Sequence, residues 1–274
     1  MRFFIVKEEN AAYYYARYKG ICRKNLQSLH SGEEIYPQAT DGFALFRNAT
    51  THIVCANKQN DIIYIAPPGK PHILINGRED IVPYDFTLTS LGGSLNLFYK
   101  TDFNDKILLY RCILGNSEKP YIIAELSNQA PYYYSACGRL FYTSSDGMLC
   151  SAIPENGSKT ITDMYEGGTM PCYISDGGRD LLVYIKDGQI YLNKRPMAED
   201  KYAEMPLVLN TNNATYIQWK SGDFIKYKRL ENDKWSDTIQ YMGTSSKPHI
   251  INIVSRGNIY PCYGYNGHPC IKIL

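Results

Sequence analysis

Apolar and polar positions alternate along almost the whole chain. Runs of about four to eight β-branched and aromatic residues are separated by short turns rich in Gly, Asn and Asp, which is typical of β-strands joined in hairpins. No stretch of about ten or more residues shows the 3.6-residue period of an amphipathic helix. The pattern therefore predicts an all-β chain.

Four hairpins stand out because a turn lies midway between two alternating segments. Asp-Gly and Asn-Gly pairs accept the positive φ values that tight hairpin turns require, and they occupy several of these turns. The predicted hairpins are Leu95–Cys112, Arg139–Ile153, Asp180–Arg195 and Asn258–Ile273.

A longer unit recurs along the chain. Tyr121–Cys137 and Arg2–Ala16 both consist of an apolar run, a polar linker with acidic residues, and a strand rich in Tyr. Weaker copies follow at Met205–Gln218 and Thr238–Asn252. A unit that recurs from one end of the chain to the other predicts one repeat architecture.

The last apolar strand of each unit gives the period of the repeat. These strands are predicted at Arg2–Lys7, Ile35–Gln38, His72–Asn76, Tyr121–Leu126, Thr160–Tyr165, Met205–Leu209 and Thr238–Met242. Repeats of roughly 40 residues with four strands each are typical of a β-propeller. We therefore predict a single β-propeller domain over residues 1–274, with seven blades. Two units are too short for four strands, so six blades remain an alternative.

The two ends of the chain are predicted to share one blade. The last unit supplies only three strands, at His249–Ser255, Asn258–Gly264 and His268–Leu274. The N-terminal strand Arg2–Lys7 would complete this C-terminal blade, which removes two exposed sheet edges.

The sequence resembles β-propellers of the sialidase-like and WD-repeat kind over its whole length. Ser144-Ser145-Asp146-Gly147 is similar to part of the Asp-box turn of sialidase-like blades, but the aromatic residue of that motif is missing. No blade ends in Trp-Asp. The resemblance implies a propeller fold and no particular catalytic residues.

Composition narrows the classes of partner. The 29 basic and 27 acidic residues leave a net charge of +2, too small for the long-range field that nucleic-acid binding uses. No apolar run is long enough for a membrane span or a signal peptide. We expect a cytoplasmic protein, or one released without a signal peptide as part of an assembly. The eight cysteines show no paired spacing and are predicted to be free and mostly buried.

Candidate binding residues lie in the linkers that lead into the first strand of each repeat. Polar residues recur there, and aromatic residues or His249 stand beside them. Aromatic rings flanked by amides and carboxylates suit a sugar or a protein partner, although Asn, Asp and Ser are also ordinary turn residues. The predicted rim residues are Tyr84, Asp85, Gln129, Tyr132, Asn213, Tyr216, Lys247 and His249.

No nucleotide-binding, hydrolase or zinc motif occurs in the chain, so no catalytic residue, metal or cofactor is predicted. This favours a non-catalytic binding or assembly module that recognises a protein or glycan through one rim of the propeller. One alternative is a glycan-active hydrolase with carboxylates at the propeller axis. Another is a structural component of a larger particle such as a viral tail or spore layer. The oligomeric state stays open.

Overall fold

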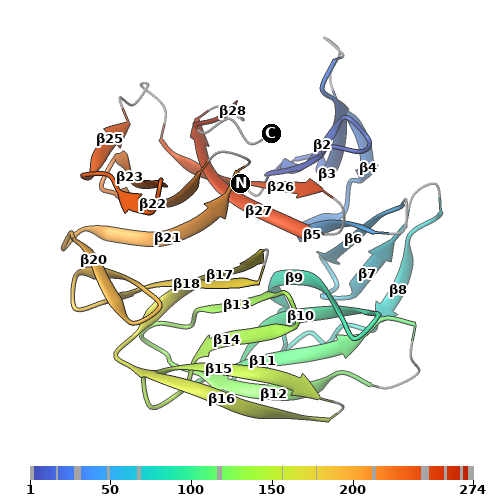
Figure 1. Cartoon of the computed structure of the whole chain (residues 1–274). Coiled ribbons are helices and arrows are strands. Elements are labelled where there is room, and N and C mark those ends of the chain that lie inside the picture. Colours follow the sequence, from blue (N-terminus) through green and yellow to red (C-terminus); the bar gives the residue numbers. More distant parts are fainter. Residues whose placement is uncertain are drawn as a thin grey trace. The chain divides into compact units, whose positions relative to one another are not determined.

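The computed structural model describes residues 3–16, 18–27, 32–47, 50–66, 69–115, 119–155, 157–176, 178–211, 214–241, 247–255, 258–265 and 268–270. Throughout these residues the regular structure consists of β-strands (Figure 1). Within the same ranges, no helix exists with the length and apolar character that crossing a membrane requires. The prediction of an all-β chain is confirmed.

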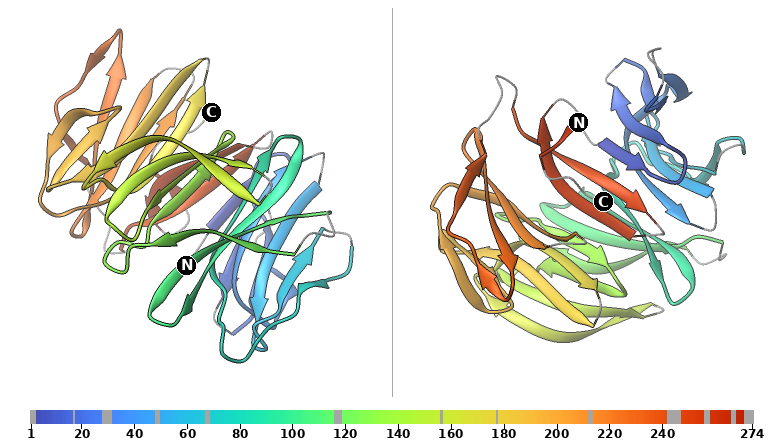
Figure 2. Two further views of the ribbon diagram at one scale, coloured as in Figure 1. Left: turned by 90° about the horizontal axis from the view of Figure 1, so that it is seen from below. Right: turned by 45° about the horizontal axis from the view of Figure 1, so that its top comes forward.

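In the described residues the strands form six antiparallel sheets of four to seven strands each, the number of blades in a six-bladed β-propeller. The strands within each sheet can be followed in Figures 1 and 2. In most sheets, strands that follow one another along the chain are hydrogen-bonded neighbours. The propeller prediction is therefore confirmed. The preferred number of seven blades is wrong, and the alternative of six is right.

The first strand explains the difference in blade number. Strand β1 (Phe3–Val6) lies between β26 (His249–Ser255) and β2 (Ala11–Ala16) in one seven-stranded sheet. The Lys7 backbone N–H donates to the Val254 carbonyl over 3.1 Å. The N-terminal strand therefore joins the sheet of the C-terminal strands, as predicted. It does so beside β26, however, rather than at the outer edge of the last strand, so the first and last repeats merge.

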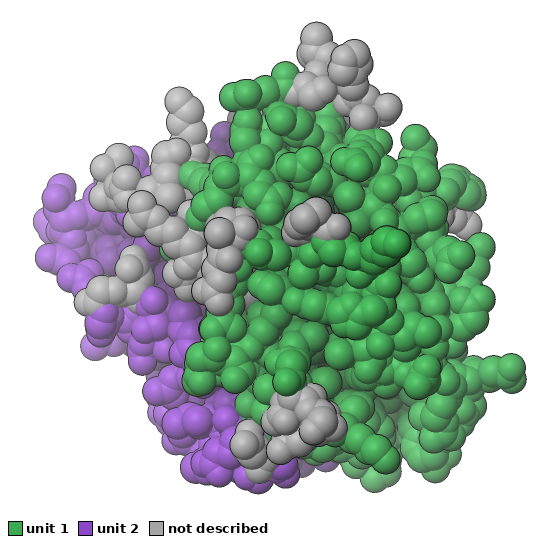
Figure 3. Space-filling model, turned by 90° about the vertical axis from the view of Figure 1, so that its right-hand side faces the viewer, with its two compact units in different colours: residues 1–125, 252–260 green, residues 126–251, 261–274 purple. Residues whose placement is uncertain are grey.

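Contacts between Cα atoms divide the chain into two compact units, drawn in green and purple in Figure 3. Unit 1 comprises residues 1–125 and 252–260. Its core includes the fully buried side chains of Val6, Val54, Leu88 and Leu97. Along the chain its further strands are β3 (Gly20–Asn25), β4 (Glu33–Tyr36), β5 (Ala39–Arg47), β6 (Thr50–Asn57), β7 (Ile62–Ile65), β8 (His72–Ile75), β9 (Tyr84–Leu91), β10 (Ser94–Phe103), β11 (Lys106–Ile113) and β12 (Tyr121–Leu126).

Unit 2 comprises residues 126–251 and 261–274. Its largest core cluster includes Val183, Val208, Ile217 and Trp219. Its strands, with β27 shared between the two residue ranges, are β13 (Tyr133–Ala136), β14 (Arg139–Thr143), β15 (Met148–Glu155), β16 (Ser158–Glu166), β17 (Thr169–Asp176), β18 (Arg179–Lys186), β19 (Gln189–Leu192), β20 (Arg195–Glu199), β21 (Ala203–Asn210), β22 (Thr215–Ser221), β23 (Phe224–Glu231), β24 (Lys234–Trp235), β25 (Ile239–Tyr241), β27 (Asn258–Tyr265) and β28 (His268–Pro269). The prediction of one domain over residues 1–274 stays a prediction.

Three of the four predicted hairpins are present as β10–β11, β14–β15 and β18–β19. In the fourth, β27 pairs with β28, while residues 266–267 at its turn and residues 271–273 lie outside the described residues. One strand was assigned to the wrong place. Met205–Leu209 is part of β21, which is the first strand of its sheet, whereas β20 is the last strand of the preceding one. The sequence repeat alone could not distinguish them, because both strands are followed directly by polar residues.

All eight cysteines are free. Six of them are buried, Cys270 is partly buried, and Cys137 is exposed. The prediction of free and mostly buried cysteines is confirmed.

Candidate functional site

Two of the predicted rim residues lie together in unit 1, at the start of β9. The Tyr84 hydroxyl donates to Asp102 Oδ1 over 2.6 Å, and Asp85 Oδ2 is 2.7 Å from Lys100 Nζ. The Asp85 backbone N–H also donates to Asp41 Oδ2 over 3.1 Å. Burial, followed by the Asp102 carboxylate, raises the pKa of Tyr84. These polar groups are hydrogen-bonded or ion-paired with one another. A structural role is therefore enough to explain the cluster.

The predicted rim residues of unit 2 are spread over several elements. Gln129 is exposed and Tyr132 is half-buried, and both lie in the linker before β13. Burial, followed by the charge of Glu204, raises the pKa of Tyr132. Lys247 is exposed before β26, and His249 begins that strand.

The predicted Asn213 and Tyr216 belong to a different kind of connection. Asn213 lies outside the described residues. Tyr216 is on β22, just after the turn that joins the first and second strands of its sheet. That turn is at the opposite end of β21 from the linker that enters the sheet. The misplacement follows from the wrong assignment of Met205–Leu209.

A pocket of about 180 Å³ opens elsewhere in unit 1. Its walls come from the β6–β7 turn, strands β7 and β8, the linker of residues 76–83, and strands β10 and β11. The apolar side chains that line it are Ile62, Ile75, Ile81 and Pro83. Polar groups come from Asn60, Asn76, Arg78 and Thr101. A concave, mostly apolar site with a few polar groups is the usual form of a ligand pocket.

Two tyrosine rings form part of the pocket wall. Tyr99 on β10 and Tyr110 on β11 are directly opposite each other in the ladder. Their rings are stacked, with centroids 5.2 Å apart and an interplanar angle of 10°. Burial is the largest cause that raises the pKa of Tyr99, so its phenol stays neutral.

A buried hydroxyl at the pocket has no partner. Thr101 is on the same face of β10 as Tyr99, because side chains alternate along a strand. Thr101 is 1% exposed, and its Oγ1 atom makes no hydrogen bond among the described residues. Buried polar groups are almost always hydrogen-bonded, and each exception requires an explanation.

Hydrogen bonds hold the linker that forms the outer wall of the pocket. The Gly77 backbone N–H donates to Asp61 Oδ1 over 2.7 Å, and Asn60 Nδ2 donates to the Arg78 carbonyl over 3.0 Å. Asn57 in turn donates to Asp61 Oδ2 over 2.9 Å. The Gly77 N–H, followed by the Asn57 amide, lowers the pKa of Asp61. The β6–β7 turn thus fixes the path of the linker before any ligand binds.

Three sheets share a bulge near the start of their first strand, and an aromatic residue of the second strand lies opposite each bulge. In each of the three sheets the hydrogen-bonded ladder shifts register at the bulge, and one residue of each bulge has a positive φ. The pairs of bulge residue and opposed aromatic residue are Asp85 and Tyr99, Met170 and Tyr184, and Met205 and Trp219.

The three sheets differ in what covers that aromatic residue. In the last sheet, the linker carboxylate of Asp200 accepts a hydrogen bond from Trp219 Nε1 over 2.9 Å. In the sheet of β17–β20, Gly168 packs so closely that an added Cβ would be 3.1 Å from Tyr184. Over Tyr99 the linker is longer, and the pocket lies in this place. The pocket therefore lies beside one of the three recurring aromatic positions, where the linker is longer, although Tyr99 itself is buried.

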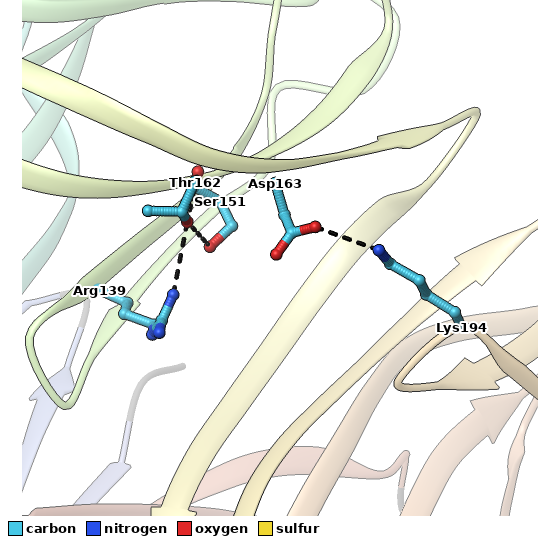
Figure 4. Close-up of polar contacts among 5 residues, drawn as sticks. All are labelled: Arg139, Ser151, Thr162, Asp163 and Lys194. Carbon is cyan, nitrogen blue, oxygen red and sulfur yellow. Dashed lines mark hydrogen bonds and ion pairs between the residues drawn. The ribbon is translucent and has the colours of Figure 1, made fainter.

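A second group of polar contacts lies in unit 2, on strand β16 (Figure 4). Arg139 Nη1 donates weakly to Thr162 Oγ1 over 3.4 Å, and Thr162 Oγ1 is 3.0 Å from Ser151 Oγ. Lys194 Nζ pairs with Asp163 over 3.1 Å. The Lys194–Asp163 pair is exposed, and such pairs contribute little to stability. These contacts connect β14, β15, β16 and the turn after β19.

The pocket was not predicted from the sequence, although the sequence does indicate that two tyrosines of its wall lie opposite each other. The predicted hairpin Leu95–Cys112 turns at Asn104 and Asp105, and counting back from that turn places Tyr99 opposite Tyr110. Nothing in the sequence shows that the linker of residues 76–83 would leave a pocket beside these rings. Among the described residues, no three His, Cys, Asp or Glu side chains are grouped as a metal site requires.

No protein-family model matches the chain, and no curated protein matches its sequence. Several solved structures are similar. The N-terminal domain of Nup159 is 10% identical, with 96% of this chain and 86% of that chain covered and a TM-score of 0.55. A chain of the mitotic checkpoint complex is 10% identical, with coverage of 97% and 86% and a TM-score of 0.55. The Aleuria aurantia lectin with Fucα1-6GlcNAc is 11% identical, with coverage of 85% and 89% and a TM-score of 0.50. What this chain shares with these proteins is the β-propeller fold.

Proposed function

We propose that this chain is a non-catalytic binding module, and that the pocket of unit 1 holds part of a glycan or a protein partner. The observation that carries the proposal is the pocket of about 180 Å³, whose wall combines the stacked Tyr99–Tyr110 pair with the apolar residues Ile75, Ile81 and Pro83. Aromatic rings and a few fixed polar groups are what a binding pocket needs for contact area and orientation.

The composition of the pocket favours binding over hydrolysis at this place. Hydrolysis of a glycoside usually requires two carboxyl groups roughly 5–10 Å apart across the scissile bond. The residues that line the pocket include no Asp, Glu or His. The alternative of a glycan-active hydrolase would therefore need a different site.

The similar structures include a lectin with a bound disaccharide and a chain of a protein complex. At about 10% identity they share only the fold with this chain, and a fold hosts many functions. The choice between a glycan and a protein partner therefore depends on the chemistry of the pocket and on experiment.

The test is a screen of the full chain against a glycan array and a peptide library, followed by two matched variants. Tyr110→Ala should weaken binding about 30-fold, since an aromatic anchor commonly contributes about 2 kcal/mol. Tyr191→Ala is the control, because the Tyr184–Tyr191 pair is stacked in the same way, at 5.3 Å and 12°, but does not line the pocket. Equal binding by both variants and the wild type would refute the pocket as the binding site.

The predicted rim remains a second candidate surface and is tested separately. Tyr132→Ala and Tyr216→Ala should abolish binding only if the rim is the contact surface. If these variants lose a ligand that Tyr110→Ala retains, then the rim binds it and the pocket does not. A third hypothesis is that the chain is a component of a larger particle. It predicts that the chain self-associates, which size-exclusion chromatography would detect.

A further inference from the structure

Strand β16 in unit 2 is long for a strand at the edge of its sheet (Figure 1). It has nine residues, whereas the edge strands β4, β8, β12, β20 and β24 have two to six each. In the part of the chain that the structure describes, β16 pairs with β15 alone. A long edge strand is a template for pairing with a further strand.

A bulge in β16 decides which of its side chains share a face. Between Ile161 and Asp163 the ladder with β15 contains one extra residue, Thr162. Thr162 Oγ1 is 3.0 Å from Ser151 Oγ, and Asp163 is opposite Ser151, so the side chains of Thr162 and Asp163 point to the same face (Figure 4). Ile161 and Met164, on the two sides of the bulge, therefore share the other face, which a regular strand would not allow.

The face that carries Ile161 and Met164 has a charge of opposite sign at each end. Along the strand it presents Lys159, Ile161, Met164 and Glu166. The two apolar side chains are accessible, with 48% of Ile161 and 50% of Met164 exposed. Glu166 is also exposed, and Lys159 is half-buried. Read in the opposite direction, this order of basic, apolar, apolar and acidic side chains is complementary to itself.

We propose that β16 pairs in antiparallel fashion with the β16 of a second copy of this chain, about a two-fold axis. Each Ile161 is then opposite Met164 of the second copy, and each Lys159 is opposite Glu166 of the second copy. Such an interface uses the same surface of both copies, as two-fold dimers do. The inference does not depend on the pocket or on the proposed function.

The bulge also selects this register over its neighbours. With Ile161 opposite Met164, Thr162 is opposite Asp163, and the two members of every pair lie on the same face of the combined sheet. A shift by one residue would place Ile161 opposite Asp163, whose side chain is on the other face. Since a one-residue slip sends side chains to the wrong face, the pairing has a defined register.

The charges contribute more to the choice of register than to the strength of the pairing. Exposed ion pairs add little to affinity, but like charges directly opposite each other disfavour a wrong alignment. Two edge strands form a small interface, so the dimer should be weak and should form only at high protein concentration. Because the pairing occupies the β16 edge of both copies, assembly through this edge ends at two chains.

The experiment is sedimentation equilibrium of the full chain at concentrations from micromolar to millimolar. Reductant is present, so that the exposed Cys137 cannot link two chains. The wild type should change from monomer to dimer over this range. Met164→Lys should weaken dimerisation roughly tenfold or more, because it removes two apolar contacts from each dimer.

Ile122→Lys is the matched control. Ile122 is an isoleucine on the edge strand β12 and is 52% exposed, so this variant places the same charge at a comparable position away from β16. It should dimerise like the wild type. Both substituted side chains are exposed, and the melting temperatures at low concentration should stay close to that of the wild type.

A charge exchange tests the register itself. Glu166→Lys should weaken dimerisation several-fold, because it places a second positive charge opposite Lys159 of the second copy. Combining Glu166→Lys with Lys159→Glu should restore dimerisation, because opposite charges then meet again.

Four results would overturn the inference. The first is a wild type that stays monomeric at every concentration, and the second is equal dimerisation by Met164→Lys and Ile122→Lys. The third is a combined charge variant that dimerises no better than Glu166→Lys, which would refute the register. The fourth is a mass that keeps rising beyond the dimer, which would favour the larger particle over a closed pair.

Discussion

Replacement of Asp200 by Ala should destabilise unit 2 more than any exposed carboxylate replacement. Asp200 follows β20 and is 8% exposed. Its carboxylate accepts hydrogen bonds from Trp219 Nε1 at 2.9 Å, Ser221 Oγ at 3.1 Å, Lys226 Nζ at 2.8 Å and the Tyr202 backbone N–H at 3.1 Å. The linker, β22 and β23 thus meet at one carboxylate.

The expected loss follows from what each donor would retain. The indole N–H of Trp219 belongs to a residue that is 1% exposed, so it would be left unsatisfied at a cost of about 1–3 kcal/mol. The Lys226 side chain is 28% exposed and can reach water. Breaking its ion pair with Asp200 should therefore cost less free energy than breaking a fully buried ion pair. When the lost hydrogen bond of the Ser221 hydroxyl is included, we expect Asp200→Ala to lower the free energy of unfolding by about 3 kcal/mol in total.

Urea denaturation measures this loss, provided that the slope with denaturant is unchanged. The control is Asp163→Ala, which breaks an ion pair whose side chains are 62% and 47% exposed and should cost less than about 1 kcal/mol. If Asp200→Ala costs no more than this control, the reasoning about the buried carboxylate is wrong.

The same carboxylate should give the stability a pH dependence. Burial works to raise the pKa of Asp200, but hydrogen bonds from Lys226, Trp219 and Ser221 more than offset it, so the pKa is lowered. A lowered pKa in the folded state contributes stability above the unfolded value of about 3.9. The difference between wild type and Asp200→Asn should therefore shrink as the pH falls below about 4.

Three further predictions concern the fold and the pocket wall. Deleting β1 and the residues before it should cost about 3–6 kcal/mol, since Phe4 and Val6 are buried; a melting temperature within about a degree of the full chain would refute the role of β1 in its sheet. Thiol titration of the folded protein should label Cys137 first, and all eight thiols should react in denaturant without reductant; fewer would reveal disulfides. Gly77→Ala should abolish ligand binding, because an added Cβ would be 2.2 Å from the Gln59 carbonyl oxygen, and unchanged affinity would show that the linker is free to move.

Much of the fold could be predicted because it depends on local patterns. The turn at Asn104 and Asp105, both with positive φ, fixes the register of β10 and β11, and alternation assigns their side chains to two faces. The repeat period then indicates a propeller.

The number of blades depends on a contact that the sequence does not encode locally. Strand β1 pairs with β26, which lies at the other end of the chain. A period of about 40 residues is compatible with either six or seven sheets, and only the pairing of β1 decides between them.

The candidate site was harder to predict, because it depends on small departures from the repeat. The bulge at Asp85 and the length of the linker before it determine whether a pocket forms beside Tyr99. The linker residues themselves were singled out for their polar character, and Tyr84 and Asp85 turned out to pair with Asp102 and Lys100. Composition identifies polar linkers, but it does not show which polar groups remain without a partner.

The central claim is that the ligand of this chain enters the pocket between the linker of residues 76–83 and the Tyr99–Tyr110 pair. A crystal structure of the full chain with the best ligand from the glycan and peptide screen tests it most directly. The account predicts part of that ligand in the pocket, in contact with Tyr110. A ligand bound at the rim residues Tyr132 or Tyr216, with the pocket empty, would contradict the account.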